Sequence, residues 1–376
     1  MRPTVKSFKP LLGNTLTATK NKASTLLQPY TPRLQQIVSY DGVSIPVTVI
    51  GRPEAEPVVL LHAFGMDARQ FLPFVLPLLG QYCFYLPHFR GFGLAANTPS
   101  SEFNFIEQYA DDLEVILTHI CAEHQAESVD VAAISMGALV VWAHFNRYAH
   151  SEPQSTTTIS NNRNRNSTTS AHNQSSTTNS SKNHSKIKRY LNIDQSPIVH
   201  NQPDWQGGVF GEKQAQIFEQ FSEVLQATLP YFQQQNITDF SHLPFAVKRQ
   251  IAQMETAFSL MSAGRLPSQL FIKSSSYLPD YKLAVYQHPT WQQKLKGLSA
   301  YLELPYDYRE ALTHTQTPVT MLIGAQSQLY DPTWQRQVAD ILPNADVVEI
   351  AESGHAIPLD TPIQFAQVLK RFLQAS

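Results

Sequence analysis

Residues 128–148 read SVDVAAISMGALVVWAHFNRY, and they place a serine between a buried strand and a helix with no intervening loop. The apolar run VDVAAI is too short for a helix, and the spacing that follows it is helical. A turn this sharp strains the backbone at Ser135, so the residues two positions before and two after it must be small. Ala133 and Gly137 meet this demand. The stretch therefore predicts a strand, a tight turn and a helix, with the hydroxyl of Ser135 raised above the carboxyl edge of a sheet.

Strand and helix signals alternate on both sides of this unit. Upstream, residues 36–51 form two extended runs around the turn pair Asp41–Gly42, which predicts an antiparallel hairpin at the edge of the sheet. Further strands are expected at residues 57–64, 82–87, 190–194, 318–324 and 345–350, and further helices at 68–79, 106–124, 332–342 and 362–373. This alternation predicts an α/β fold with a mostly parallel, doubly wound sheet that carries helices on both faces.

Composition divides the chain into a core, a cap and two irregular segments. Residues 1–34 are basic, with no acidic residue before Asp41, and are expected to form a loosely ordered arm. Residues 151–188 carry almost no apolar side chains, so they cannot offset the entropy of ordering and are expected to be a disordered insertion. Residues 197–310 lack strong strand signals but show helical spacing, which predicts an inserted helical cap. The core is then expected in residues 35–150, 189–196 and 311–376.

Charge and composition exclude several classes of function. The chain has 28 Lys and Arg residues against 30 Asp and Glu residues, so it carries no basic footprint for nucleic acid. No apolar stretch approaches the roughly 18 to 20 residues that cross a bilayer, no signal-peptide core opens the chain, and the two cysteines suit a reducing compartment. No histidine or cysteine cluster has metal-ligand spacing, and no Gly-rich phosphate loop follows a strand. We therefore expect a cytoplasmic protein with no integral membrane segment, no metal and no cofactor, whose partner is a small, apolar molecule.

Two roles are open to Ser135. As the residue before a helix it can be an N-cap, which is common. As a nucleophile it needs a base within hydrogen-bond reach, and histidine is the side chain whose ordinary pKa suits that task. Of the 13 histidines, His355 follows a strand and a glycine and precedes a helix, so it falls in a loop at the same carboxyl edge of the sheet. The first helical amides after the serine, above all that of Met136, point at whatever the serine attacks.

Several motifs arrive in the order of one known family. Besides the serine turn, they are His62-Ala63-Phe64-Gly65 after a strand, Pro87-His88-Phe89-Arg90-Gly91-Phe92-Gly93, and Gly354-His355-Ala356-Ile357-Pro358-Leu359-Asp360-Thr361-Pro362. With these motifs the chain resembles the α/β-hydrolase fold superfamily, and within it the lid-bearing serine esterases, over about residues 36–148 and 189–373. The resemblance implies Ser135 as the nucleophile and His355 as the base. It also implies an oxyanion hole made by the amides of Phe64 and Met136, with His62 organising the loop beside the substrate.

The third member of the triad departs from the family pattern. Many relatives carry an acidic residue three positions after the glycine that ends the penultimate strand, and here Gly324 is followed at that position by Ser327. Two aspartates remain as candidates. Asp194 ends the preceding core strand, as the acid does in certain dehalogenases of this fold, whereas Asp331 precedes Pro332 and a helix, where an N-cap explains it without catalysis. We favour Asp194 and keep Asp331 as the alternative acid.

These motifs lead to a hypothesis about the reaction. We predict a serine hydrolase that cleaves a carboxylic ester or related acyl substrate through an acyl-enzyme intermediate. The alternatives on the same triad are an acyltransferase, a carbon–carbon bond hydrolase and a perhydrolase. A non-catalytic ligand-binding protein of this fold is a further alternative, because Ser327 stands where the acid is expected. Trp205, just past the sheet, is a candidate for binding substrate at the entrance.

Overall fold

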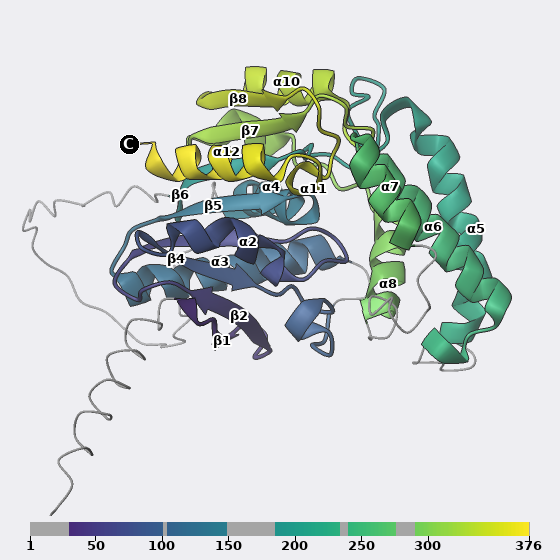
Figure 1. The fold of residues 1–376 in the computed structure, drawn as a ribbon, viewed down its shortest axis with the longest axis horizontal. Coiled ribbons are helices and arrows are strands. Elements are labelled where there is room, and N and C mark those ends of the chain that lie inside the picture. Colours follow the sequence, from purple (N-terminus) through teal and green to yellow (C-terminus); the bar gives the residue numbers. More distant parts are fainter. Residues whose placement is uncertain (1–29, 101–103, 149–184, 234–239, 276–289, 376) are drawn as a thin grey trace, which may run out of the picture.

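An eight-stranded sheet forms the centre of the molecule (Figure 1). The computed structural model describes residues 30–100, 104–148, 185–233, 240–275 and 290–375. The strands are β1 (Arg33–Val38), β2 (Ser44–Ile50), β3 (Glu56–Leu61), β4 (Tyr82–Pro87), β5 (Val129–Ile134), β6 (Ile187–Ile193), β7 (Val319–Gly324) and β8 (Ala345–Ile350), in the order β1-β2-β4-β3-β5-β6-β7-β8. The β1–β2 and β2–β4 pairs are antiparallel, and the other pairs are parallel. The predicted mostly parallel sheet with an antiparallel N-terminal hairpin is therefore confirmed.

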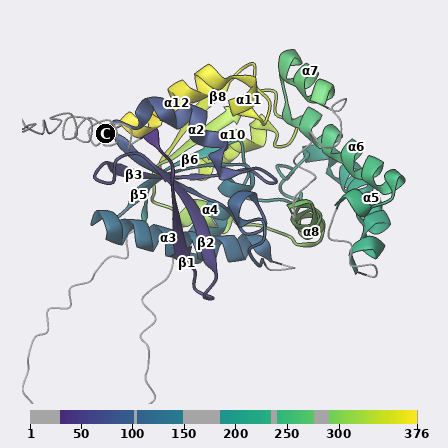
Figure 2. The same cartoon turned by 60° about the horizontal axis from the view of Figure 1, so that its bottom comes forward.

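Helices cover both faces of the sheet (Figure 2). The elements that flank it are α2 (Leu72–Val75), α3 (Phe105–His124), α4 (Met136–Tyr148), α9 (Glu310–His314), α10 (Pro332–Ile341), α11 (Ile357–Asp360) and α12 (Pro362–Gln374). Side chains alternate along β5, so that Val131 and Ala133 join the apolar cluster under α3 and α4, whereas Ala132 and Ile134 join the one under α12. Because both faces are covered, every side chain of β5 is buried, as is typical of a central parallel strand.

The helix expected at residues 68–79 is the main error in the predicted elements. Instead of one helix, the chain makes a 3-10 turn at Ala68–Phe71, the four-residue α2, and a second 3-10 turn at Leu76–Leu78. Pro73 and Pro77 stand near the starts of the second and third of these turns. Proline has no backbone N–H to donate, so each proline ends the preceding turn and begins a new one.

Four helices gather beside one end of the sheet (Figures 1 and 2). They are α5 (Gln214–Gln233), α6 (Phe245–Ser262), α7 (Leu266–Ser275) and α8 (Thr290–Glu303). Leu225 of α5, Val247 of α6 and Leu295 of α8 share one apolar cluster, so these helices bury their apolar faces against one another. They occur within the stretch where a cap is expected, and the boundaries of that cap at residues 197 and 310 stay predictions.

Two expected segments lie largely outside the described residues. The N-terminal arm falls there up to residue 29, and the polar insertion falls there from residue 151 to residue 184. Within the described part of the chain, we find no helix with the length and apolar character needed to span a membrane.

Candidate active site

Ser135 lies in a left-handed turn between β5 and α4. Its φ is +53°, a region that residues other than glycine rarely adopt and that costs about 1–3 kcal/mol. Its carbonyl oxygen accepts the amides of Ala138 and Leu139 at 2.8 and 3.0 Å, so α4 begins at once. Gly137 is needed here, because a Cβ at this position would lie 2.7 Å from the carbonyl oxygen of Leu61. The strained turn that the sequence predicts is therefore present.

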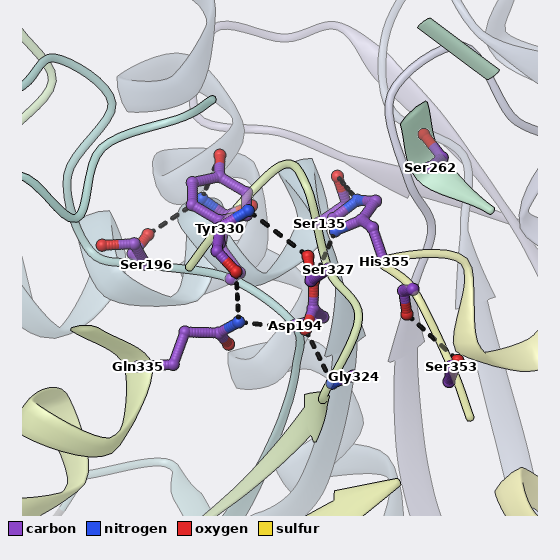
Figure 3. A network of polar contacts seen from close by, with 12 residues as sticks. Ser135, Asp194, Ser196, Ser262, Gly324, Ser327, Tyr330, Gln335, Ser353 and His355 are labelled. Carbon is purple, nitrogen blue, oxygen red and sulfur yellow. Dashed lines mark hydrogen bonds and ion pairs between the residues drawn. The ribbon is translucent and has the colours of Figure 1, made fainter. Parts of the chain in front are cut away.

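The structure brings Ser135, His355 and Asp194 into one hydrogen-bonded chain (Figure 3). Nε2 of His355 lies 3.0 Å from Oγ of Ser135, and Nδ1 lies 2.8 Å from Oδ2 of Asp194. Because a carboxylate can only accept, the imidazole proton belongs on Nδ1, and Nε2 is left to accept the serine proton. The three residues follow β5, β8 and β6, so they meet at the carboxyl ends of parallel strands.

The carboxylate of Asp194 is completely buried and receives four hydrogen bonds. Oδ1 accepts from the amide of Gly324 at 2.9 Å and from Nε2 of Gln335 at 3.0 Å. Oδ2 accepts from His355 and from Oγ of Ser327 at 2.6 Å. A buried charge requires such a set of donors, because burial alone disfavours ionisation strongly. The surroundings of Asp194 therefore suit an ionised carboxylate that faces the imidazole.

Asp331, the alternative acid, performs the structural task that its sequence context predicts. It is the N-cap of α10, and its Oδ1 accepts the amide of Thr333 at 2.7 Å. The side chain is exposed to solvent. Of the two aspartates, it is thus Asp194 that the fold brings to the ring of His355.

The two amides expected in the oxyanion hole lie on neighbouring elements. Met136 is the first residue of α4, where backbone N–H groups have no acceptor within the helix. Phe64 lies in the loop that follows β3. That loop packs on the first turn of α4, because a Cβ on Gly137 would reach the carbonyl oxygens of both Leu61 and His62 within 2.8 Å. The arrangement is compatible with two donors beside Ser135.

His62 holds two loops together. Its ring is completely buried, Nδ1 lies 2.8 Å from the carbonyl oxygen of Ala63, and Nε2 accepts the amide of Phe89 at 3.1 Å. Burial lowers the pKa of His62 to about 4, so the ring is neutral at neutral pH. The expected role of organising the loop fits these contacts. Both ring nitrogens have protein partners, and a contact between His62 and substrate stays a prediction.

Trp205 packs against the side of the core. Its ring centroid lies 4.9 Å from that of Trp334 on α10, and the guanidinium of Arg309 lies 5.7 Å from the ring centroid. The side chain is buried, and among the described residues its Nε1 has no hydrogen-bond partner. Trp334 belongs to α10, one of the helices that flank the sheet. A contact between Trp205 and substrate stays a prediction.

Sequence reasoning missed the carboxylate that ties the α6–α7 connection to the histidine loop. Oδ2 of Asp360 accepts the amide of Gly354 and the amide of Gly264, both at 2.8 Å. The carbonyl oxygen of Ser262 accepts the amide of Ala356, also at 2.8 Å. Asp360 is part of the Gly354–Pro362 motif, but its partner Gly264 is distant in sequence and carried no signal that could have been recognised.

Helix α8 contacts the loop that carries Phe64. The Phe64 ring packs edge-on against Phe92 and against Tyr301 of α8, with centroid separations of 5.6 and 5.7 Å. Gly297 of α8 lies so close that a Cβ there would come within 2.6 Å of Cε2 of Phe64. The four-helix region therefore touches the candidate site at two places, the Phe64 loop and the histidine loop.

Comparisons with known proteins identify the family and the fold of the chain. The model of the alpha/beta hydrolase family matches residues 58–368. An esterase from Exiguobacterium antarcticum is similar in structure, with a TM-score of 0.61 and 16% identity over 91% of this chain and 99% of that chain. An esterase from Rhodococcus has a TM-score of 0.59 and 16% identity over 91% of this chain and 98% of that chain. A bromoperoxidase from Bacillus anthracis has a TM-score of 0.60 and 15% identity over 92% of this chain and 100% of that chain. The comparison with curated proteins found no match. At these identities the structural likeness shows a shared fold.

Proposed function

Because the chain belongs to the alpha/beta hydrolase family, we propose that it is a serine hydrolase that cleaves a carboxylic ester or a related acyl compound. Membership of the family supports hydrolysis in general. The observation that carries the finer proposal is the position of His355, which lies within hydrogen-bond distance of both Ser135 and Asp194. A serine, a histidine and an aspartate in this order are the parts that nucleophilic acyl transfer to water requires.

The proposed reaction begins with proton transfer from the serine. As Oγ of Ser135 attacks the carbonyl carbon, Nε2 of His355 takes its proton, and Asp194 stabilises the imidazolium that forms. The imidazolium then gives the proton to the leaving alkoxide, and an acyl-enzyme remains. Water, deprotonated by His355, releases the acid and restores the hydroxyl of Ser135. The amides of Phe64 and Met136 are the donors that we propose for the oxyanion formed in both steps.

The surroundings of the Phe64 loop support an apolar acyl group in the substrate. Phe64, Phe92 and Tyr301 bring three aromatic rings together where α8 meets this loop. Apolar walls with few polar groups are typical of pockets that bind small organic ligands. We propose that α5 to α8 form the cap over the candidate site. The two free cysteines, Cys83 and Cys121, are both buried and support the cytoplasmic location proposed for the enzyme.

The non-catalytic alternative loses its main support. It was motivated by a serine at position 327 in place of an acid. Asp194 lies 2.8 Å from His355 and supplies the carboxylate that Ser327 cannot. A ligand-binding protein has no need to hold a buried carboxylate, an imidazole and a strained serine in line, so we favour an enzyme.

A covalent label tests the proposal directly. The purified protein should react with a fluorophosphonate at Ser135 and hydrolyse short p-nitrophenyl esters. The Ser135→Ala variant should do neither while melting at the same temperature. Ser196→Ala is the matched control, because it removes another hydroxyl that is buried close to Asp194 and has no partner among the described residues. A folded parent protein that stays unlabelled and leaves these esters intact would contradict the proposed function.

A further inference from the structure

The hydroxyl of Ser327 shares one carboxylate oxygen with the imidazole of the triad. We propose that Ser327 is a positioning residue that tunes the basicity of His355 through Oδ2 of Asp194. The inference rests on the proposed function, because it assigns a role within the same triad. It concerns the position where relatives carry the acid itself, so it also explains what the serine at that position does.

The direction of the Ser327 hydrogen bonds follows from its partners. The amide of Tyr330 can only donate, and it lies 3.3 Å from Oγ of Ser327, which must accept there. The carboxylate of Asp194 can only accept, and its Oδ2 lies 2.6 Å from the same Oγ. The hydroxyl proton therefore points at the carboxylate; Figure 3 marks the contacts of Ser327 as dashed lines.

A tight turn holds Ser327 in this place. β7 ends at Gly324, and the amide of Ser327 donates to the carbonyl oxygen of Gly324 at 3.0 Å. Gly324 itself leaves no room for a side chain, because a Cβ would lie 2.2 Å from the carbonyl oxygen of Gly354, next to His355. The turn and the histidine loop are thus packed together, and the distance from Ser327 to the carboxylate is determined by backbone contacts.

The two oxygens of Asp194 have different tasks. Oδ1 accepts from Gly324 and Gln335, and these two donors prevent the carboxylate from rotating. Oδ2 accepts from His355 and Ser327, the two donors found for this oxygen among the described residues. Loss of the hydroxyl therefore leaves the carboxylate in its orientation and changes only the electron density that Oδ2 offers to the imidazole.

The sign of the effect follows from this competition. A hydroxyl that donates to Oδ2 stabilises the negative charge there and weakens its attraction for the imidazolium of His355. When the hydroxyl is removed, the same carboxylate stabilises the imidazolium more, so the ring holds its proton to higher pH. The free enzyme needs a neutral ring to act as base. As the pH is lowered, the activity of the variant should therefore begin to fall at a higher pH than that of the parent.

Other charged groups near His355 do not change in this comparison. The ring of Tyr330 lies 5.9 Å from the imidazole, and burial raises the pKa of Tyr330 far above neutrality, so it stays uncharged. Asp360 accepts the amide of Gly354 and the amide of Arg265, and Arg265 forms an ion pair with Glu352. These groups are the same in the parent and in a Ser327 variant, and their influence cancels when the two are compared.

The test is a pair of pH titrations on matched variants. For Ser327→Ala we expect the acid limb of kcat/KM to move up by about 0.5 to 1 pH unit, and the titration midpoint of His355 measured by NMR to move with it. Ser327→Thr keeps the hydroxyl and should titrate as the parent does. Ser196→Ala is the control for losing a buried hydroxyl that makes no such bond, and it should leave both midpoints unchanged.

Each outcome decides a different question. If both midpoints stay unchanged or move down in Ser327→Ala, the tuning role is wrong, and the serine hydrolase proposal stands as long as the parent is labelled and active. If the parent is neither labelled nor active, the proposed function fails first. Ser327→Cys, whose thiol is a much weaker donor, is the second variant in case the alanine variant does not fold, and it should move the midpoints in the same direction.

Discussion

Replacing Asp194 by asparagine should remove most of the activity, because the new amide would select the wrong tautomer of the base. Oδ1 of Asp194 accepts from Gly324 and Gln335 at 2.9 and 3.0 Å, and these donors hold an amide oxygen as well as a carboxylate oxygen. The NH2 group of the asparagine must then take the place of Oδ2, 2.8 Å from Nδ1 of His355. Since an NH2 group only donates, the ring must carry its proton on Nε2. Nε2 then cannot accept the proton of Ser135.

The size of the effect follows from this loss of the base. An imidazole held in the wrong tautomer lowers kcat by about 10⁴-fold in serine triads, which corresponds to about 5 kcal/mol of transition-state stabilisation. We expect a loss of about 10³-fold or more for Asp194→Asn. Asp331→Asn is the matched control, because asparagine caps a helix about as well as aspartate, and its kcat should stay within about twofold of the parent.

The assay compares kcat and kcat/KM of both variants on a p-nitrophenyl ester, together with the rate of inactivation by a fluorophosphonate. Thermal melts establish that each variant is folded. If Asp331→Asn loses the activity while Asp194→Asn stays close to the parent, Asp194 is not the acid, even though it lies 2.8 Å from His355.

Two further predictions concern stability and the cap. Burial lowers the pKa of both His62 and His88 to about 4, from an ordinary value of 6.5, so the unfolded chain binds protons first as the pH falls. As the pH falls from 7.5 to 5, each histidine should therefore lower the free energy of unfolding by about 2 kcal/mol. Urea titrations that give the same free energy of unfolding over this range would contradict the lowered pKa values. Gly297→Ala should lower kcat several-fold, because its Cβ would lie 2.6 Å from the ring of Phe64 and must displace it. The gain in helix propensity of about 1 kcal/mol offsets part of this packing cost, so the melting temperature should change by only a few degrees. Adding Phe64→Leu should restore kcat, and an unchanged kcat in the single variant would show that the ring moves aside freely.

Local patterns predicted the strained turn at Ser135 and the sheet, because each depends on residues that are close in sequence. The small residues around Ser135 encode the turn, and the alternating runs encode parallel strands that meet at one edge. The position of His355 followed from the same edge rule. To place Ser135 and His355 at this edge, it is enough to know where each strand ends, and the end of each apolar run in the sequence gives that point.

The parts that depend on contacts between distant segments were harder to predict. Position 327 looked like a lost acid, and only the packing of β6 beside β7 shows that its hydroxyl reaches Asp194. The prolines at 73 and 77 are visible in the sequence, but the apolar spacing around them is that of one continuous helix and does not reveal the two missing N–H donors. The tie between Asp360 and Gly264 joins residues 96 positions apart, and no local pattern encodes such a pair.

This tie limits how the entrance can open. Gly264 and Gly354 approach so closely that a Cβ on either would lie within 2.5 Å of the other's backbone nitrogen, and one carboxylate binds both amides. Pulling the α6–α7 corner away would break the bonds from the amides of Gly264 and Arg265 to Asp360 and the bond from the amide of Ala356 to the carbonyl oxygen of Ser262, at a cost of several kcal/mol. The corner should therefore stay in place when the four helices move, and we expect any opening to occur where α8 contacts the Phe64 loop through aromatic rings.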